Sequence, residues 1–599
     1  MYLFACRKYT LNTPADTFLG HVDSVLQCLN DKGVRLDTAT LATVQGSLQR
    51  MAGSYPSAAT PSARGYTSVK AVTYSAASGE RPAANAIPQT AAEVRSNAQG
   101  SAATDNGIAR PHPSELPSSI TELRRWVAQG KLSVQESLRL QDKRLRNQDT
   151  LIHSVANFCE WSFPDDTAAP LAGVALAHKD NIATGQFMPG NGLPVKQAER
   201  YAATGGANAV AATEATNAAA ENYAPYSEAA PVIARLQSHG ATQLATLVMA
   251  ERACGATSEN HHYPDVNNPL GDALFVGGSS SGSAAAVAAG FVYGALGTDT
   301  AGSVRIPAAS CGLVGFKPSR HVLPGAGVVP LSPSLDTVGL LTRSVSDLLA
   351  LYTAATAGDH PGDHCAHGSH FYGKGLRSLV KGISLGNALD LRRLTTPVAD
   401  TLEVFLQRLA TSTPLHAVPL DVSRDSGIHG ETLFYYEAAM QHACALQEDP
   451  FSMNVVARQL VAQGLLIPDA WYAQARDQRQ RLRDEFIAKH FDQADLLLIP
   501  AFSVSVPRRA EVTFGTREFD PASLLGVYRW MMPANYFDLP ALVMPVGTDA
   551  LRRPVSVQVL ARPGAETQLL AFASRFEEEN CDGRGLFGLG APHMQTYSH

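Results

Sequence analysis

Apolar residues recur at helical spacing in the first 150 residues of the chain. The stretches 14–31 and 37–51 place them at every third or fourth position and predict two short helices. Two later stretches, SITE from Ser119 and SVQE from Ser133, match the capping box, in which a serine and a glutamate three residues later satisfy the first backbone N–H groups of a helix. An apolar stripe follows each box, so helices are predicted to begin at Ile120 and Val134.

The middle of the chain alternates between short apolar runs and helical patterns. The apolar run 171–177 predicts a buried strand that leads into His178 and Lys179. The alternation continues with a helix, a strand, a helix and a strand over 232–237, 243–249, 283–289 and 291–296. The later part is mostly helical over 398–490, with strands at 496–499 and 541–546. This order predicts the α/β class, with a mixed central sheet covered by helices on both faces.

Changes in composition divide the chain into three parts. Residues 1–55 form a small helical extension, and residues 56–117 are rich in Ala, Ser, Thr, Pro and Asn without periodicity, as in a flexible linker. A single large domain is predicted over 118–599, interrupted by an Ala-rich insert at about 198–225.

Charge and cysteine content exclude several classes of protein. The 599 residues carry a formal net charge of −6 with a pI near 6.3, whereas binding to polyanions requires many basic groups. The eight cysteines form no CxxC pair. The N-terminal residues have no basic segment followed by a long apolar stretch, so we expect no signal peptide. The uncharged stretch 273–298 is interrupted by GGSSSGS, which is costly to desolvate in lipid. We expect a cytoplasmic protein without a nucleic-acid or membrane partner.

The GGSSSGS run at 277–283 is compatible with several functions. It could be a simple turn, and it imitates a phosphate loop but has Ser283 where that loop requires lysine. It also satisfies the G-x-S-x-G pattern of a nucleophile elbow, which would make Ser280 the nucleophile of an α/β-hydrolase. That interpretation needs an acid and a histidine further along the chain.

A second Gly/Ser element, LGTDTAGSVRIPA from Leu296, helps to decide between these interpretations of GGSSSGS. Together with Lys179 in a KDN context and with GGSSSGS, it resembles the amidase signature family, including the spacing of its two serines. Further matching runs are GLVGFKPSR, LSPSLDTVG and PANYFDLPALVMPVG. The resemblance covers about 118–575. Since only about 25 residues follow it, we do not expect the additional C-terminal domain that allophanate hydrolases often carry.

The resemblance implies a catalytic triad of Lys179, Ser279 and Ser303. Ser303 would attack an amide carbonyl, and Lys179 would take the proton through Ser279, which follows a cis peptide bond at Gly278. A lysine can act as a base only when it is neutral, and burial favours its neutral form. The oxyanion would be bound by the backbone N–H groups of Thr300, Ala301, Gly302 and Ser303. The family usually has glycine at the position of Ala301.

Asp299 and Arg305 flank the proposed nucleophile and are expected to pair and hold its loop. Neither a cofactor nor a metal ion is implied. The segment 360–370 contains four histidines and a cysteine, and we interpret it as a surface loop, with metal binding as the alternative.

The expected function is hydrolysis of a C–N bond in a small linear amide, carbamate or urea-type substrate. The alternative is an amidotransferase subunit that releases ammonia from glutamine for a partner protein. A binding protein that has kept the fold without catalysis is a third possibility. The sequence leaves the oligomeric state open, including a homodimer.

Overall fold

The computed structural model describes residues 116–198, 226, 228–357, 383–386, 394–418, 424–448 and 452–580. The helices predicted over 14–31 and 37–51 lie outside the described residues. The same holds for residues 360–370 and for almost all of the predicted linker and the Ala-rich insert.

A mixed β-sheet organises the described part of the chain. Its strands follow the order β1-β3-β2-β4-β6-β5-β10-β11-β9-β7-β8. Strand β2 is parallel to both β3 and β4, and β7 is parallel to both β8 and β9, whereas the other pairs are antiparallel. The strands are β1 (Val155–Phe158), β2 (Ala175–Lys179), β3 (Thr242–Leu247), β4 (Gly294–Asp299), β5 (Val314–Lys317), β6 (Thr337–Thr342), β7 (Ile383–Gly386), β8 (Leu415–Val418), β9 (Leu496–Pro500), β10 (Ala541–Thr548) and β11 (Pro554–Ala561).

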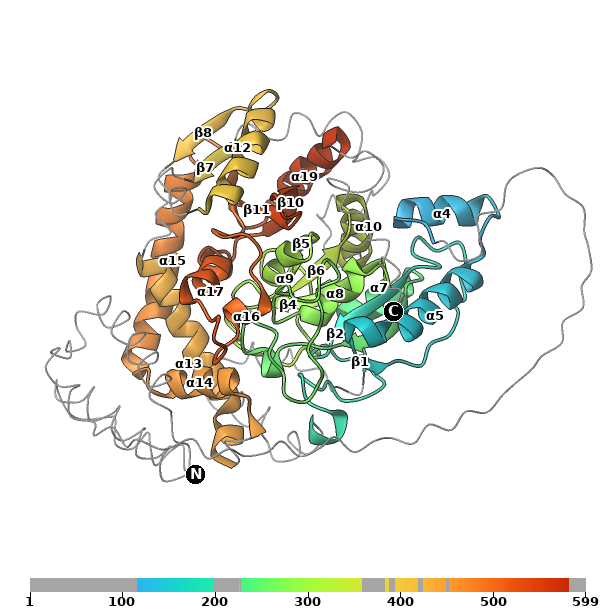
Figure 1. Cartoon of the computed structure of the whole chain (residues 1–599), viewed down its shortest axis with the longest axis horizontal. Helices are drawn as coiled ribbons and strands as arrows, with labels where there is room; N and C mark the ends of the chain where they lie inside the picture. Colours follow the sequence, from blue (N-terminus) through green and yellow to red (C-terminus); the bar gives the residue numbers. More distant parts are fainter. Residues whose placement is uncertain are drawn as a thin grey trace, which may run out of the picture. The chain divides into compact units, whose positions relative to one another are not determined.

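Helices cover both faces of this sheet, as predicted (Figure 1). Helix α8 packs on β2, β3, β4 and β6, and α9 packs on β5, β10 and β11. Helices α10, α12 and α19 also pack on strands of the sheet, but their buried side chains belong to a different hydrophobic cluster. The helices are α4 (Ile120–Ala128), α5 (Val134–Ile152), α7 (Pro231–Ser238), η3 (Glu251–Ala253), α8 (Ser281–Ala288), α9 (Arg305–Ser310), α10 (Val345–Thr356), α12 (Thr396–Ala410), α13 (Arg424–Glu448), α14 (Val455–Leu465), α15 (Asp469–Phe491), α16 (Arg509–Val512), α17 (Pro521–Tyr528), α18 (Met532–Tyr536) and α19 (Glu566–Asn580).

Neighbouring residues of the central strands belong to two different cores. Leu176 and Leu296 pack in the cluster that includes side chains of α7 and α10. Their chain neighbours Ala177 and Ala295 pack in the cluster that includes the alanines of α8. Because side chains alternate between the faces of a strand, both faces of the sheet centre are buried. The ends of the central strands are therefore shielded from water.

At both predicted helix starts, the serine makes the N-cap hydrogen bond of the predicted capping box. The Ser119 hydroxyl accepts a hydrogen bond from the Glu122 N–H at 3.2 Å, and α4 begins at the next residue. The Ser133 hydroxyl accepts one from the Glu136 N–H at 3.1 Å, and α5 follows. The start of each helix could therefore be predicted from local side-chain chemistry.

Two of the predicted strands start later than predicted. The run 171–177 is predicted to be strand throughout, but residues 171–173 form a turn in which Gly173 has a φ of +89°, and β2 covers Ala175–Lys179. Likewise β4 covers Gly294–Asp299 rather than 291–296, because residues 291–293 form a bend. The turn residues are as apolar and as buried as the strand residues that follow them, so the pattern does not show where each strand starts. The correction places Lys179 and Asp299 at strand ends.

The region 398–490 is mainly helical, as predicted, but it also contains the four-residue strand β8. This strand lies at the edge of the sheet and is paired only with β7 among the described residues. Four residues are too few for a pattern to distinguish a strand from the end of a helix.

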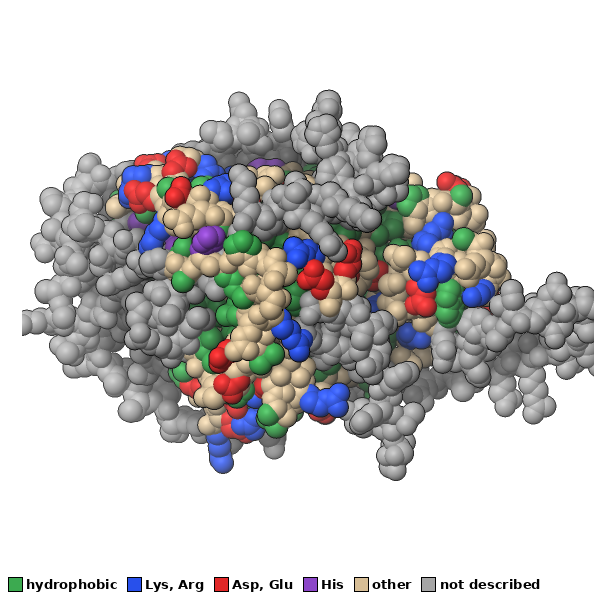
Figure 2. All heavy atoms as spheres, turned by 90° about the horizontal axis from the view of Figure 1, so that it is seen from above, with side chains coloured by type: hydrophobic (Ala, Val, Ile, Leu, Met, Phe, Trp, Pro, Cys, Tyr) green, Lys and Arg blue, Asp and Glu red, His purple; other side chains and the backbone are tan. Residues whose placement is uncertain are grey.

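The described surface is mixed in charge. Figure 2 shows acidic and basic side chains interspersed on the face that it presents. Among the described residues, we find no helix that combines the length and apolar character needed to cross a bilayer.

Candidate active site

Parallel pairing of β2 with β4 brings two of the predicted site residues to one edge of the sheet. His178 pairs with Leu296 in this register, so Lys179 at the end of β2 lies beside the end of β4, where Thr298 and Asp299 are found. The side-chain nitrogen Nζ of Lys179 is 2.7 Å from the hydroxyl oxygen of Thr298. A sheet contact between residues more than a hundred positions apart thus builds the first part of the site.

Ser279 completes a buried contact with Lys179. Its Oγ lies 2.7 Å from Lys179 Nζ, and both residues are fully buried. Burial lowers the pKa of Lys179 to about 7, although the negative charges of Asp336 and Asp299 act in the opposite direction. A substantial fraction of this lysine is therefore neutral at physiological pH and able to accept a proton.

The backbone around Ser279 is held closely by neighbouring segments. The Gly278–Ser279 peptide bond is cis, and the Ser279 carbonyl accepts a hydrogen bond from the Ala250 N–H at 3.0 Å. A Cβ atom added to Gly278 would lie 2.9 Å from the backbone nitrogen of Ser258. Only glycine therefore fits at position 278.

Ser303 differs from Ser279 in its exposure to solvent. It is partly exposed, whereas Ser279 and Ser280 are fully buried. The Ser303 carbonyl accepts a hydrogen bond from the Ser280 N–H at 3.2 Å, which ties the two Gly/Ser elements together. Of these three serines, only the one predicted as nucleophile is partly open to solvent.

Ser280 is placed unfavourably for the nucleophile-elbow interpretation. Its hydroxyl is buried and donates to the Thr298 carbonyl at 3.3 Å, immediately before α8 begins. A hydrogen bond between Ser280 and a histidine is absent from the described residues. These contacts favour a packing role for Ser280.

The predicted set of oxyanion donors needs one revision. The Gly302 N–H donates to Asp299 Oδ1 at 2.8 Å, so this group is already used within the protein. In the described part of the chain, the N–H groups of Thr300, Ala301 and Ser303 have no hydrogen-bond partner. Sequence reasoning missed the difference because it depends on the orientation of individual peptide groups.

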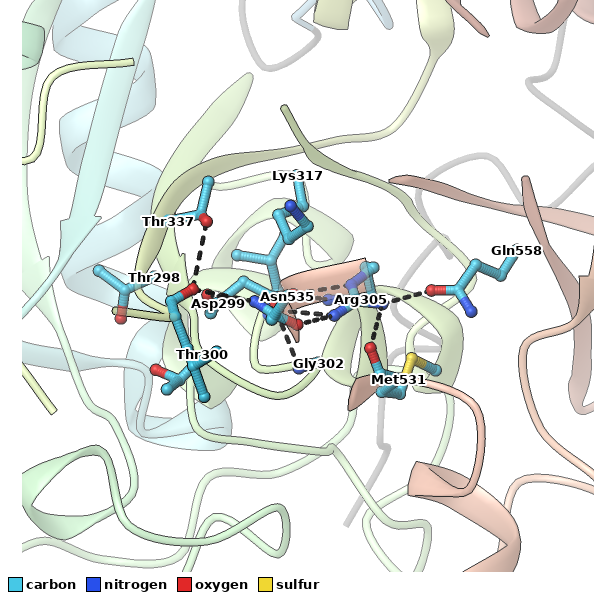
Figure 3. A network of polar contacts seen from close by, with 12 residues as sticks. Thr298, Asp299, Thr300, Gly302, Arg305, Lys317, Thr337, Met531, Asn535 and Gln558 are labelled. Atoms are coloured by element: carbon cyan, nitrogen blue, oxygen red, sulfur yellow. Dashed lines mark hydrogen bonds and ion pairs between the residues drawn. The ribbon is translucent and has the colours of Figure 1, made fainter. Parts of the chain in front are cut away.

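Asp299 and Arg305 form a fully buried ion pair at the centre of a polar network (Figure 3). Two hydrogen bonds join the side chains, from Nη2 to Oδ1 at 2.8 Å and from Nε to Oδ2 at 3.0 Å. Burial alone would raise the pKa of Asp299, but the Arg305 charge and these hydrogen bonds outweigh it and hold the pKa well below its usual range. The pair fixes both ends of the turn that carries Ser303.

Distant segments satisfy the remaining groups of this network. Arg305 donates to the side-chain oxygen of Asn535 at 2.6 Å, to the Met531 carbonyl at 3.0 Å and to the side-chain oxygen of Gln558. Asn535 in turn donates to the Asp299 carbonyl at 2.8 Å. Asn535 lies in the run PANYFDLPALVMPVG, whose match to the family indicates its importance. Gln558 lies outside the matching runs, and no sequence pattern indicates its role.

Asp336, which immediately precedes β6, also contacts the turn that carries Ser303. Its Oδ1 accepts a hydrogen bond from the Thr300 hydroxyl at 2.6 Å, and its Oδ2 accepts from the N–H of Leu331 at 2.8 Å. Burial raises the pKa of Asp336 to about 6. The run LSPSLDTVG thus contributes a carboxyl group that positions Thr300.

Comparison with known proteins agrees with the fold and the motifs. The family model "Amidase" matches residues 203–570. The chain is 31% identical over 488 residues to a glutamyl-tRNA(Gln) amidotransferase subunit from Thermus thermophilus, a match that covers 76% of this chain and 96% of that protein. The corresponding subunit from Oleidesulfovibrio alaskensis is 28% identical over 504 residues, with 77% and 96% covered.

Solved structures show the same class. A crystal structure described as an amidase superposes with a TM-score of 0.61 at 27% identity and covers 77% of this chain and 99% of its own. The peptide amidase of Stenotrophomonas maltophilia shares the fold, with a TM-score of 0.60 at 22% identity and coverage of 80% and 99%. The architecture is thus that of an amidase, and the chain belongs to the amidase signature family.

Replacing Asp299 by asparagine tests the buried pair. We expect Asp299→Asn to lower the free energy of unfolding by roughly 3–5 kcal/mol, because Arg305 would remain buried without a counter-charge. Chemical denaturation followed by circular dichroism measures this change.

The control is Glu579→Gln, which removes the partner of Arg575 from an exposed ion pair with a distance of 2.8 Å. Its effect should stay below about 0.5 kcal/mol. Equal stability of the two variants would contradict the central role of the buried pair.

Proposed function

We propose that this protein hydrolyses the C–N bond of a carboxamide through an acyl-enzyme on Ser303. The observation that carries the proposal is the fully buried 2.7 Å contact between Lys179 Nζ and Ser279 Oγ. The neighbouring Ser280 N–H donates to the carbonyl of the partly exposed Ser303, which ties this contact to the turn of Ser303. A serine hydroxyl becomes an effective nucleophile only when a base removes its proton during the attack. Lys179, with its lowered pKa, supplies such a base.

The proposed reaction has two halves. Ser303 Oγ attacks the amide carbonyl while its proton passes to Ser279 and the Ser279 proton passes to Lys179. The C–N bond then breaks, and the leaving amine takes the proton back along the same route. Water attacks the resulting ester in the second half, with the same groups accepting and returning its proton, and releases the carboxylic acid and Ser303.

Three backbone donors would stabilise the tetrahedral intermediates. The N–H groups of Thr300, Ala301 and Ser303 lie in the turn held by Asp299, Arg305 and Asp336. Donors held in place before the reaction require little reorganisation as negative charge develops, and one such donor typically contributes about 3 kcal/mol to transition-state stabilisation.

Two candidate functions differ in the amide that serves as substrate. In the first, the chain acts by itself on small linear amides, in line with the amidases among its structural neighbours. The second is release of ammonia from glutamine as one component of an amidotransferase. The relatives named as amidotransferase subunits favour the second, because the chain spans 96% of the length of the two described above.

Labelling and mutation test the roles of the serines and the lysine. A fluorophosphonate should label Ser303, and Ser303→Ala or Lys179→Met should reduce amide hydrolysis by on the order of 10⁴-fold, since members of such a triad act as a unit. Peptide mapping and steady-state kinetics measure these effects.

Ser280→Ala is the matched control, because it removes a hydroxyl from the same loop. It should retain both the label on Ser303 and most of the activity. Labelling of Ser280 would support the nucleophile-elbow interpretation instead, and a chain that neither reacts nor hydrolyses any amide would support a binding protein.

The pH dependence of catalysis tests the base. Since protonated Lys179 cannot accept a proton, kcat/KM should be low in acid and rise to a plateau as the pH passes about 7. Initial rates across the neutral range, on a substrate without ionisable groups, give the profile.

Lys317→Met controls for a second buried lysine whose pKa burial also lowers to about 7. Lys317 Nζ donates to the Pro318 carbonyl at 2.9 Å and should not control the rate, so the inflection should persist in this variant. Loss of the inflection in Lys317→Met would contradict the assignment of the base.

Ammonia release separates the two candidate functions. With Ser303→Ala as the blank, release of ammonia from simple aliphatic or aromatic amides by the purified chain alone would establish the first function. Turnover of glutamine that appears only when the other components of an amidotransferase are added would instead establish the second function.

A further inference from the structure

Two histidines and a glutamate converge beyond the end of β3, among residues to which the proposed chemistry gives no role. Glu251 opens η3, and His261 and His262 lie in the following loop. One potential ligand atom from each of the three residues lies within 4.8 Å of the other two. The closest pair is Glu251 Oε2 and His261 Nδ1, at 2.6 Å.

The backbone holds these three residues in place. The Glu251 N–H donates to the Glu259 carbonyl at 3.2 Å, which closes the loop between them. Asn260 donates through its side chain to the Met249 carbonyl at 2.9 Å, and its side-chain oxygen accepts from the His262 N–H at 2.8 Å. The convergence therefore requires little further ordering of the chain.

The cluster combines a buried polar atom that lacks a described partner with a side chain that is open to solvent. The Nε2 atom of His262 is buried without a hydrogen-bond partner among the described residues. Glu251 is fully buried, and His261 has 42% of its side chain exposed. A cation could therefore enter past His261 and reach a carboxylate inside.

A simple ion pair between Glu251 and His261 accounts for only part of this arrangement. It leaves the buried Nε2 of His262 unexplained, although buried polar atoms normally have partners. From the convergence of the three side chains we propose that Glu251, His261 and His262 bind a divalent cation of the zinc class, with water completing the coordination. Two imidazoles and one carboxylate suit zinc and its neighbours, whereas magnesium and calcium prefer oxygen ligands alone.

The contacts of Glu251 leave room for such a cation. Its Oε1 accepts from the Asn454 N–H at 3.2 Å and lies 3.9 Å from Arg252 Nε. Oε2 faces His261 and shares the Asn454 N–H at 3.3 Å. One oxygen can therefore keep its protein contacts while the other coordinates the metal. The nearby positive charge of Arg252 weakens the attraction, which favours a cation bound mainly through the imidazoles.

A cation bound here would stabilise the segment that supports the proposed catalytic loop. Ala250, next to Glu251, donates its N–H to the Ser279 carbonyl, and Gly278 packs against the backbone of Gly255 and Ser258. Asn454, which contacts Glu251, caps α14. The cation would thus stabilise the 250–262 segment together with α14, because the Glu251 carboxylate would bind both the cation and the N-cap residue of α14. It would take no part in the amide chemistry.

Zinc titration of the full-length chain tests this site. The metal-free protein competes with a chromophoric chelator for Zn²⁺, and Co²⁺ absorption reports nitrogen and oxygen ligands. We expect about one tight equivalent and a higher melting temperature with zinc. His262→Gln and His261→Gln should each weaken binding by at least about tenfold, because the loss of an outer-sphere partner alone can cost that much.

The histidines of 360–370 provide the necessary control, since they are a second potential zinc site in the same chain. The variant His364→Gln/His367→Gln should retain the tight equivalent. The proposal is overturned if the wild-type chain binds no zinc, if that double variant loses the tight equivalent, or if His261→Gln binds like the wild type. His261 is largely outside the core, so its variant remains informative if His262→Gln fails to fold.

Discussion

The buried ion pair between Asp299 and Arg305 is the interaction on which the geometry of the candidate site depends. A charge inside a protein is tolerated when it is paired and fully hydrogen-bonded, and here several neighbouring segments contribute to that condition. The pair connects the end of β4 to the start of α9, so the turn between them has little freedom. Because Ser303 lies in this turn, the position of the proposed nucleophile follows from the electrostatics of the core.

Burial has different consequences for the two kinds of charge in the site. Asp299 keeps its charge because a guanidinium faces it, whereas Lys179 donates to two hydroxyl groups and a carbonyl and loses part of its charge. The same dry environment therefore gives a permanent anion that supports the structure and a lysine that can exchange a proton. This contrast lets a lysine, rather than a histidine, fill the role of base in the proposed chemistry.

Local patterns predicted much of this structure, and long-range contacts account for what they missed. Lys179, Ser279 and Ser303 lie in short motifs, and the caps at Ser119 and Ser133 depend on neighbouring residues only. The starts of β2 and β4 could not be located because burial on both faces removes the alternation that marks a strand. Gln558 and the convergence of Glu251 with the two histidines depend on how distant segments fold, which a single sequence does not display.

The partners of Arg305 also bear on how the protein is made. Met531, Asn535 and Gln558 are translated more than two hundred residues after the arginine that they contact. Until those residues leave the ribosome, the Arg305 guanidinium lacks most of the hydrogen-bond acceptors that make its burial tolerable. The turn that carries Ser303 is therefore not yet held in its final conformation. The nascent chain would therefore contain most of the signature motifs before the turn of the proposed nucleophile, Ser303, takes its final shape.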